Sequence, residues 1–205
     1  MKKVLITGGN GDISKAIIKK LEKEGGYEIY APSHSEMDVT DMDAVTAYVE
    51  KIKPDMLINN AGYVKPQSIK QCDIKTAKNA IDVNLFGTYN CTAAVLRIKP
   101  DAQVINIGSS AATKIHGTWS SYCASKAAVV MATQCWAADG VDTVCVSPGR
   151  TRTKMRKGLY PDEDQTTLMD PNDFAAVVMK AVHHDYPAGA HINVNINNVK
   201  ELIHG

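Results

Sequence analysis

The sequence predicts an α/β fold, in which a doubly wound parallel sheet lies between two layers of helices, a three-layer α/β/α arrangement. Strand-like apolar runs alternate with helix-like periodic segments along the chain, a pattern typical of a parallel sheet covered on both faces. The first apolar run leads directly into a glycine-rich turn, as in a strand-to-helix connection. The 205 residues suit a single domain, 1–205, and no internal repeat or long linker divides them.

The first half of the chain accounts for three strands and three helices. Apolar residues recur at helical spacing between Asp12 and Glu24, and two glycines then end that helix. Thr40 is expected to cap the next helix, whose apolar side carries Met42, Val45, Val49 and Ile52. Strands are expected at 3–7, 27–31 and 55–59, and a longer helix at about 74–97.

The second half continues the same alternation. Further strands are expected at 103–108, 142–147 and 190–195, with a helix from Ser121 to about Ala137 between the first two. Asp170 is expected to begin the last long helix, because it supplies a cap and is followed by a first-turn proline and an early acid. The whole chain is therefore consistent with one parallel sheet.

Composition and charge exclude several classes of partner and site. The formal net charge is +1, so no overall field favours nucleic acid or a membrane surface. No apolar run is long enough to span a membrane, and the apolar start of the chain stops at Thr7, which indicates a strand rather than a signal peptide. Five cysteines without a CxxC pair favour neither a disulfide framework nor a zinc site, so we expect no metal. We expect a soluble cytoplasmic protein.

The glycine-rich turn, TGGNGDIS at 7–14, has the chemistry of a phosphate site. Gly8 and Gly11 allow a tight turn and the close approach of a pyrophosphate to the backbone. The helix that follows offers free N–H groups and its positive dipole end, and Ser14 is expected to pack that helix against the strand. A plain loop is the alternative, but the position after the first strand favours a dinucleotide cofactor and hence a Rossmann-type sheet.

Two further clusters fit the same ligand. Asp38, followed by Val39, comes after the second strand, where its carboxylate can accept from the exocyclic amine of an adenine. Small residues follow the third strand in the run Asn60-Ala61-Gly62, where they allow the chain to pass close to a ribose. The alternatives are an acid at a helix start for the first cluster and a simple turn for the second.

A tyrosine and a lysine lie one helical turn apart near the middle of the chain. Tyr122 precedes Lys126 by four residues, so both side chains share one helix face, and Ser109 stands thirteen residues before Tyr122. A free tyrosine has a pKa of about 10, and a neighbouring positive charge favours tyrosinate. This arrangement indicates that a proton can be moved beside the cofactor.

In this order the motifs resemble those of the short-chain dehydrogenases/reductases, over nearly the whole chain. The matching segments are the glycine turn, Asp38-Val39, Asn59-Asn60-Ala61-Gly62, Asn84, Ser109, Tyr122-x-x-x-Lys126 and the run from Pro148 to Thr153. The turn departs from the standard pattern, because TGxxGxxS is closer to the TGxxGxxG of the sugar-nucleotide branch than to TGxxxGxG. The chain is also short for the family, and only 154–169 remain to cover a substrate.

The resemblance implies a catalytic set of Asn84, Ser109, Tyr122 and Lys126. Tyr122 is expected to donate a proton in carbonyl reduction and to accept one in alcohol oxidation, while Ser109 binds the substrate oxygen. Lys126 is expected to hold the ribose hydroxyls at the nicotinamide end, and Asn84 to hold a water that extends the proton relay. The hydride chemistry belongs to the cofactor.

The same resemblance implies the cofactor contacts. The expected residues are Gly8, Asn10, Gly11, Asp12, Ile13, Ser33, His34, Asp38, Val39, Asn60, Ala61, Gly62, Tyr122, Lys126, Pro148, Gly149, Thr151 and Thr153. No acid stands at the end of the second strand to accept from a ribose 2′-hydroxyl, whereas Ser33 and His34 can donate to a 2′-phosphate. NADP(H) is therefore favoured over NAD(H).

The sequence thus predicts an NADP(H)-dependent oxidoreductase that interconverts a carbonyl and an alcohol on a small-molecule substrate. A nucleotide-sugar reductase or epimerase is the second enzyme hypothesis, because of the glycine turn. A non-catalytic dinucleotide sensor or scaffold is the third hypothesis, although a pure binder has no need of the proton relay. The helices at about 74–97 and 121–137 are those through which the family forms oligomers, so we expect a homodimer or homotetramer.

A basic run beside the expected site leaves the charge of the substrate open. Five cations crowd into 150–157, namely Arg150, Arg152, Lys154, Arg156 and Lys157. They favour either an anionic substrate or a solvated loop that is partly balanced by the acids at 162–164. His116, in the segment between Ser109 and Tyr122, is a further candidate for substrate contact.

Overall fold

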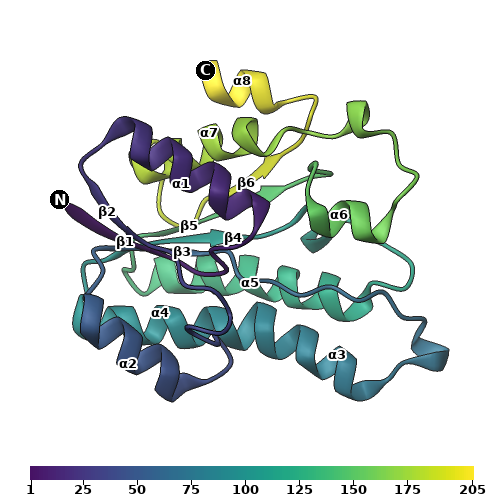
Figure 1. Ribbon diagram of the computed structural model, residues 1–205, viewed down its shortest axis with the longest axis horizontal. Helices are drawn as coiled ribbons and strands as arrows, with labels where there is room; N and C mark the ends of the chain where they lie inside the picture. Colours follow the sequence, from purple (N-terminus) through teal and green to yellow (C-terminus); the bar gives the residue numbers. More distant parts are fainter.

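The protein folds around a six-stranded sheet in which every strand pair is parallel (Figure 1). The computed structural model describes all residues, 1–205. The strands are β1 (Lys2–Ile6), β2 (Tyr27–Tyr30), β3 (Met56–Asn59), β4 (Gln103–Ile107), β5 (Thr143–Pro148) and β6 (His191–Val194). Their order is β2-β1-β3-β4-β5-β6, so the direction of winding changes between β1 and β3. In such a sheet the crevice at the carboxyl ends of these two strands is where ligands bind.

Helices cover both faces of the sheet and complete the three layers. They are α1 (Asp12–Glu24), α2 (Met42–Ile52), α3 (Ile74–Ile81), α4 (Gly87–Ile98), α5 (Ser120–Ala138), α6 (Lys154–Leu159), α7 (Pro171–Val182) and α8 (Val199–His204). In Figure 1, α1, α7 and α8 lie on one side of the sheet, and α2, α4 and α5 lie on the other. No helix combines the length and apolar character that crossing a membrane requires.

Two separate apolar cores hold these layers together. Because side chains alternate along a strand, Val4 and Ile6 point into the core beneath α1 and α7, while Leu5 points into the core beneath α2 and α4. Phe174 of α7 is fully buried in the first core, and Val45 of α2 is fully buried in the second. Burial on both faces explains why the strands are continuous apolar runs in the sequence.

The predicted fold class is confirmed, and the six strands lie where they were expected, each to within one residue at both ends. The long helix predicted at about 74–97 is different, because residues Asp82–Phe86 between α3 and α4 form a π-helical segment. Such segments are frequent at functional sites, and this one carries Asn84. The short helices α6 and α8 were not predicted, since each has only six residues.

The predicted cap of α2 is wrong by one residue. Asp41, and not Thr40, begins the helix, because its Oδ1 accepts from the backbone N–H of Asp43 at 3.0 Å and of Ala44 at 3.1 Å. The Thr40 hydroxyl is directed elsewhere and donates to Oδ1 of Asp38 at 2.8 Å. Aspartate and threonine are both common caps, so the sequence alone did not distinguish these neighbours.

Replacing the observed cap tests this assignment. Asp41→Ala should lower the free energy of unfolding by about 1 kcal/mol, because two amide groups of the first turn lose their acceptor. Thr40→Ala, the matched control, should change it by less than about 0.5 kcal/mol. Urea unfolding of both variants measures the difference, and a larger loss for Thr40→Ala would show that the cap is misassigned.

Candidate active site

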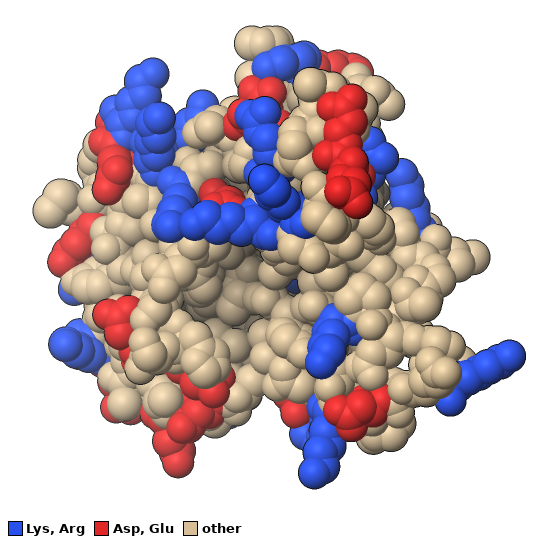
Figure 2. Space-filling view, turned by 45° about the vertical axis from the view of Figure 1, so that its right-hand side comes forward, with Lys and Arg blue, Asp and Glu red and all other residues tan.

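A cavity of about 380 Å³ opens at the carboxyl ends of the strands. Figure 2 shows the hollow on this face, with Lys and Arg side chains along one rim. The cavity runs from the glycine turn to α5 and brings together fourteen of the predicted cofactor residues: Gly8, Asn10, Gly11, Asp12, Ile13, Ser33, His34, Asn60, Ala61, Gly62, Tyr122, Lys126, Pro148 and Thr153. Asp38 and Val39 are not among its lining residues, and Gly149 and Thr151 line a neighbouring cavity instead.

The glycine turn is shaped by close contacts that only glycine allows. Gly8 has a φ of +68°, and a Cβ atom there would lie 3.0 Å from the Cα atom of Ala61. Gly9, to which the sequence analysis assigned no role, passes so close to β2 that a Cβ atom would lie 2.1 Å from the carbonyl oxygen of Ala31. The turn therefore lies directly against the ends of both neighbouring strands.

The amino end of α1 is suited to a phosphate group. Gly11 is the N-cap residue, and no side chain caps the helix there. Asp12 and Ile13 of the first turn line the cavity together with Gly8 and Gly11. Free N–H groups at a helix N-terminus, with the positive end of its dipole, form an anion site, so the residues present fit the pyrophosphate of a dinucleotide.

Ser14 links the glycine turn to the loop after β3. Its Oγ atom accepts from Nδ2 of Asn60 at 2.7 Å, and the Thr7 hydroxyl oxygen accepts from the backbone N–H of Asn60 at 3.0 Å and of Ala61 at 2.9 Å. Ser14 is fully buried, as a residue that packs α1 against β1 must be. The serine in TGxxGxxS therefore has a local structural role in this chain.

The structure places Asn84 beside the site, not at the cavity wall. Its side chain is fully buried, accepts from the backbone N–H of Tyr63 at 2.7 Å, and donates to the Tyr63 carbonyl at 2.9 Å and to Oγ of Ser125 at 3.0 Å. These contacts join the π-helical segment to the loop after β3 and to α5. The side chain thereby fixes the position of the helix that carries Tyr122 and Lys126.

Lys126 is buried at the cavity wall and has an unusual pKa. Its residue is only 5% exposed, and Nζ donates to the carbonyl oxygen of Ile107 at 2.8 Å. Burial disfavours the charged form and lowers the pKa of the Lys126 amine to about 8. At neutral pH the amine is largely protonated, and an ammonium group has further N–H donors besides the one that Ile107 accepts.

Tyr122 is a neutral phenol in this environment. Burial raises the pKa of Tyr122, and the neighbouring Ser109 hydroxyl acts in the opposite direction by hydrogen bonding to the charged form. Desolvation of the phenolate outweighs the effect of Ser109, and the expected lowering of the pKa by Lys126 is not seen. A neutral phenol is the form that donates a proton.

A second cavity of about 170 Å³ adjoins the first at Tyr122, which lines both. Ser109 and Tyr122 form its polar end, and Trp119 and Tyr160 are among its apolar residues. Ser110 and His116 also line it, so His116 is in position to contact a substrate. No spacing in the sequence indicated Trp119 or Tyr160, because Trp119 precedes α5 and Tyr160 follows α6.

The basic run at 150–157 is largely paired with acids. Arg156 and Arg150 both face Glu163, and Arg152 forms an ion pair with Asp170. Of the two hypotheses for this run, an anionic substrate or a loop balanced by the acids at 162–164, the second is closer to the observed pairing. Lys154 and Met155 were not among the predicted cofactor residues, but both line the first cavity, and the backbone N–H of Lys154 donates to Asp12 at 2.6 Å.

Comparisons with known proteins agree with this geometry. The family model of the short chain dehydrogenases matches residues 2–164. An oxidoreductase of Staphylococcus saprophyticus is 30% identical, over 98% of this chain and 87% of its own length. The 3-oxoacyl-(acyl-carrier-protein) reductase of Vibrio harveyi is 28% identical, over 95% of this chain and 96% of its own length. A solved small-chain dehydrogenase in complex with NADPH has the same fold, with a TM-score of 0.87 at 22% identity, covering 97% of this chain and 99% of the other.

The low pKa of Lys126 makes the stability of the protein depend on pH. The amine has a pKa of about 8 in the folded protein and about 10.4 when unfolded. Between these values the unfolded chain binds more protons, so stability rises with pH. Lys126→Met has no charge to bury, so its free energy of unfolding should not show this dependence. The free energy of unfolding of the variant minus that of the wild type should therefore be about 2 kcal/mol larger at pH 7.5 than at pH 9.5.

Urea unfolding at the two pH values measures this change. Lys19→Met, which replaces an exposed lysine of α1, is the matched control and should follow the wild type at both. If the difference in free energy of unfolding between Lys126→Met and wild type stays constant with pH, the burial of a charged amine is contradicted.

Proposed function

We propose that this chain, which belongs to the short-chain dehydrogenase family, is an NADP(H)-dependent oxidoreductase that interconverts a carbonyl and an alcohol on a small substrate. One observation carries the proposal: Tyr122 lines both the cavity that begins at the glycine turn and the smaller cavity that contains Ser109. A cofactor in the first and a substrate in the second would meet at the phenol. This is the arrangement that hydride transfer with proton transfer requires.

The first cavity supports a dinucleotide along its whole length. The amino end of α1 would hold the pyrophosphate, and Gly62 with its small neighbours leaves room for a ribose. Lys126, at the far end, would donate to ribose hydroxyls through the N–H groups that Ile107 does not occupy. When bound, the nicotinamide supplies or accepts the hydride.

The end of β2 supports a preference for NADP(H). Ser33 and His34 line the cavity there, and no acidic residue of this strand end does so. Glu36 lies behind them, where its carboxylate accepts from the backbone N–H of Ser33 at 2.8 Å and from the Ser33 hydroxyl at 2.7 Å. A 2′-phosphate would need the Ser33 hydroxyl to turn from Glu36 toward the cavity. It would also need a donor from the His34 ring, whose Nε2 lies 3.4 Å from the carboxylate of Asp38.

The proton chemistry follows from the state of Tyr122. In carbonyl reduction, the neutral phenol donates its proton to the substrate oxygen as negative charge develops there, and the Ser109 hydroxyl donates a hydrogen bond to the same oxygen. In alcohol oxidation, Tyr122 must first lose its proton, and the ammonium group of Lys126 on the same helix face favours that form. The raised pKa of Tyr122 keeps the phenol protonated near neutral pH, which is the state that carbonyl reduction requires.

The size of the second cavity supports a small substrate over a nucleotide sugar. Its volume of about 170 Å³ lies below the roughly 300–1,000 Å³ of pockets that enclose drug-sized ligands. The sugar-nucleotide hypothesis was based on the TGxxGxxS turn, and Ser14 there has its own structural partner in Asn60. A non-catalytic sensor would not need Ser109 and Tyr122 together at the wall of this cavity.

The outer face of α4 and α5 supports assembly into a homodimer or homotetramer. Phe86, Tyr89 and Met131 are exposed large apolar side chains on the π-helical segment, α4 and α5. These are the helices through which the sequence analysis expects oligomers to form. Burial of such side chains against a second copy would remove apolar surface from water.

Removing the phenol hydroxyl tests the proposed function. Tyr122→Phe should lower kcat for reduction of small aldehydes and ketones with NADPH by at least about 100-fold, because the proton donor is lost. Binding of NADPH, followed by its fluorescence, should stay near the wild-type level, since the ring itself remains. Tyr48→Phe, on α2 and outside the lining of both cavities, is the matched control and should keep full activity. Equal turnover by Tyr122→Phe and wild type would overturn the mechanism.

A further inference from the structure

The cavity beside Tyr122 is lined by both aromatic and cationic side chains, and the inference about them rests on the function proposed above. Trp119 and Tyr160 form an aromatic wall, and Arg150 and Arg156 also line the cavity. Two arginines would normally predict an anionic substrate, whereas two aromatic rings favour a flat, apolar one. The contacts of the two arginines distinguish an anionic substrate from a flat, apolar one.

The aromatic wall extends directly from the phenol. The ring of Trp119 lies edge-on to that of Tyr122, with centroids 5.6 Å apart, and stacks with that of Tyr160 at 6.2 Å and an interplanar angle of 23°. The His116 ring lies 5.4 Å from that of Trp119. A flat substrate with its carbonyl at Tyr122 would therefore meet ring faces and edges next to the reacting group.

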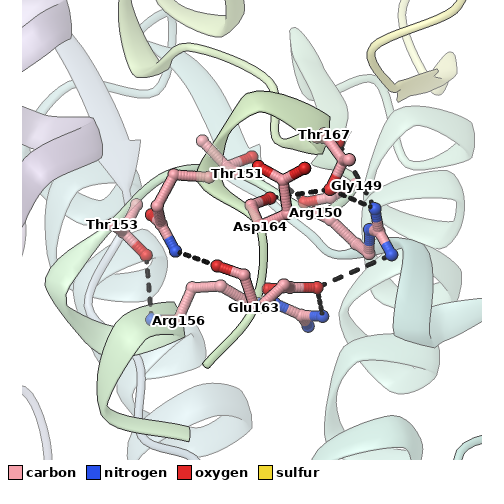
Figure 3. A network of polar contacts seen from close by, with 9 residues as sticks. Gly149, Arg150, Thr151, Thr153, Arg156, Glu163, Asp164 and Thr167 are labelled. Atoms are coloured by element: carbon pink, nitrogen blue, oxygen red, sulfur yellow. Dashed lines mark hydrogen bonds and ion pairs between the residues drawn. The ribbon is translucent and has the colours of Figure 1, made fainter. Parts of the chain in front are cut away.

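Arg156 is fully engaged by Glu163. Its Nε and Nη2 atoms donate to the two carboxylate oxygens of Glu163, each at 2.6 Å, and Figure 3 shows the two side chains facing each other beneath the loop. The pair is well shielded, with side chains only 18% and 15% exposed. These hydrogen bonds from Arg156 hold the pKa of Glu163 below its usual range, so the carboxylate is charged at neutral pH.

Both arginines also have partners other than Glu163. The guanidinium of Arg156 lies over the ring of Tyr160, 4.1 Å from its centroid, so the cation also stabilises the aromatic wall. Arg150 approaches Glu163 at 3.5 Å and donates to the Thr167 hydroxyl at 2.9 Å (Figure 3). To pair with Arg156, an anionic substrate would have to displace Glu163, and at either arginine it would lie close to the negative charge of that carboxylate.

We propose that Glu163 determines substrate charge: by holding Arg150 and Arg156, it makes the cavity beside Tyr122 select neutral, planar carbonyl compounds over anionic ones. The arginines then serve to fix the loop 160–167 and Tyr160 over the cavity. The same carboxylate is the only acid that both arginines contact, so removing its charge would leave two cations beside the substrate.

A matched pair of aldehydes tests the proposal. 4-Formylbenzamide and 4-formylbenzoate share the ring and the reacting group and differ in the charge at the opposite end. The wild type should reduce the amide with a kcat/KM at least about 10-fold above that of the carboxylate, because like charges in close contact are strongly unfavourable. Glu163→Gln should lower this ratio by about 10-fold or more, chiefly through a smaller KM for the carboxylate.

The neighbouring acid provides the control for a general change of charge. Asp162→Asn removes one negative charge from the same loop, and Asp162 is exposed and contacts neither arginine. A ratio that changes equally in Asp162→Asn and Glu163→Gln would overturn the role of Glu163. A wild type that reduces the carboxylate as well as the amide would overturn the selection itself, while leaving the oxidoreductase function intact.

Failure of the underlying function gives a different result, because the wild type would then reduce neither aldehyde with NADPH or NADH. If Glu163→Gln does not fold, inhibition of the wild type still tests the selection. Benzamide should compete with the neutral aldehyde at lower concentrations than benzoate, and the reverse order would contradict the proposal.

Discussion

The site depends on one joint, where the glycine turn after β1 meets the loop after β3. A single hydroxyl, that of Thr7, accepts from two successive backbone amides of the loop, those of Asn60 and Ala61, and Asn60 in turn donates to Ser14 at the start of α1. Gly8 makes this possible, because any side chain there would collide with Ala61. The joint ties the turn after β1 to the loop after β3 at the point where the winding of the sheet reverses, which is where ligands bind in such sheets. The amino end of α1, with its uncapped amides, then lies at the wall of that crevice.

A second polar connection positions the reactive helix over the other end of the same crevice. Nδ2 of Asn59 donates to Asn106 on β4 at 2.9 Å, and Nδ2 of Asn106 donates to the hydroxyl of Thr133 on α5, also at 2.9 Å. These buried hydrogen bonds cross the interface between the sheet and α5 and favour one position of α5 over others, although Oδ1 of Asn59 has no hydrogen-bond partner. With α5 in that position, the Lys126 amine donates a hydrogen bond to the carbonyl of Ile107, and burial destabilises its charged form. The buried amine therefore lowers the stability of the folded protein, and it lies where the proposed chemistry needs a cation.

The sequence was sufficient for the parts of this arrangement that are local. The periodicity of α1 and the glycine turn are short-range patterns, and both were located from the sequence. The order of motifs along the chain was enough to place Ser109, Tyr122 and Lys126 at one cavity system. The cap of α2 was misplaced because Thr40 and Asp41 are chemically equivalent as caps until one of them finds another partner. The pairing of Arg156 with Glu163 and the stacking of Trp119 on Tyr160 could not be foreseen, because they depend on how the segment 154–169 folds back over the cavity. The sequence therefore left the substrate charge open, whereas the contacts of two arginines favour a neutral one.

Binding of the cofactor is the most direct test of the central claim, that one crevice from the glycine turn to Tyr122 holds a nicotinamide dinucleotide. The purified protein should be titrated separately with NADPH and NADH while the fluorescence of the reduced nicotinamide is followed. The account predicts saturable binding, with NADPH bound more tightly than NADH because Ser33 and His34 line the crevice at the end of β2. Binding of neither dinucleotide would contradict the account, since the shape of the glycine turn, the uncapped helix and the buried lysine would then serve a different ligand.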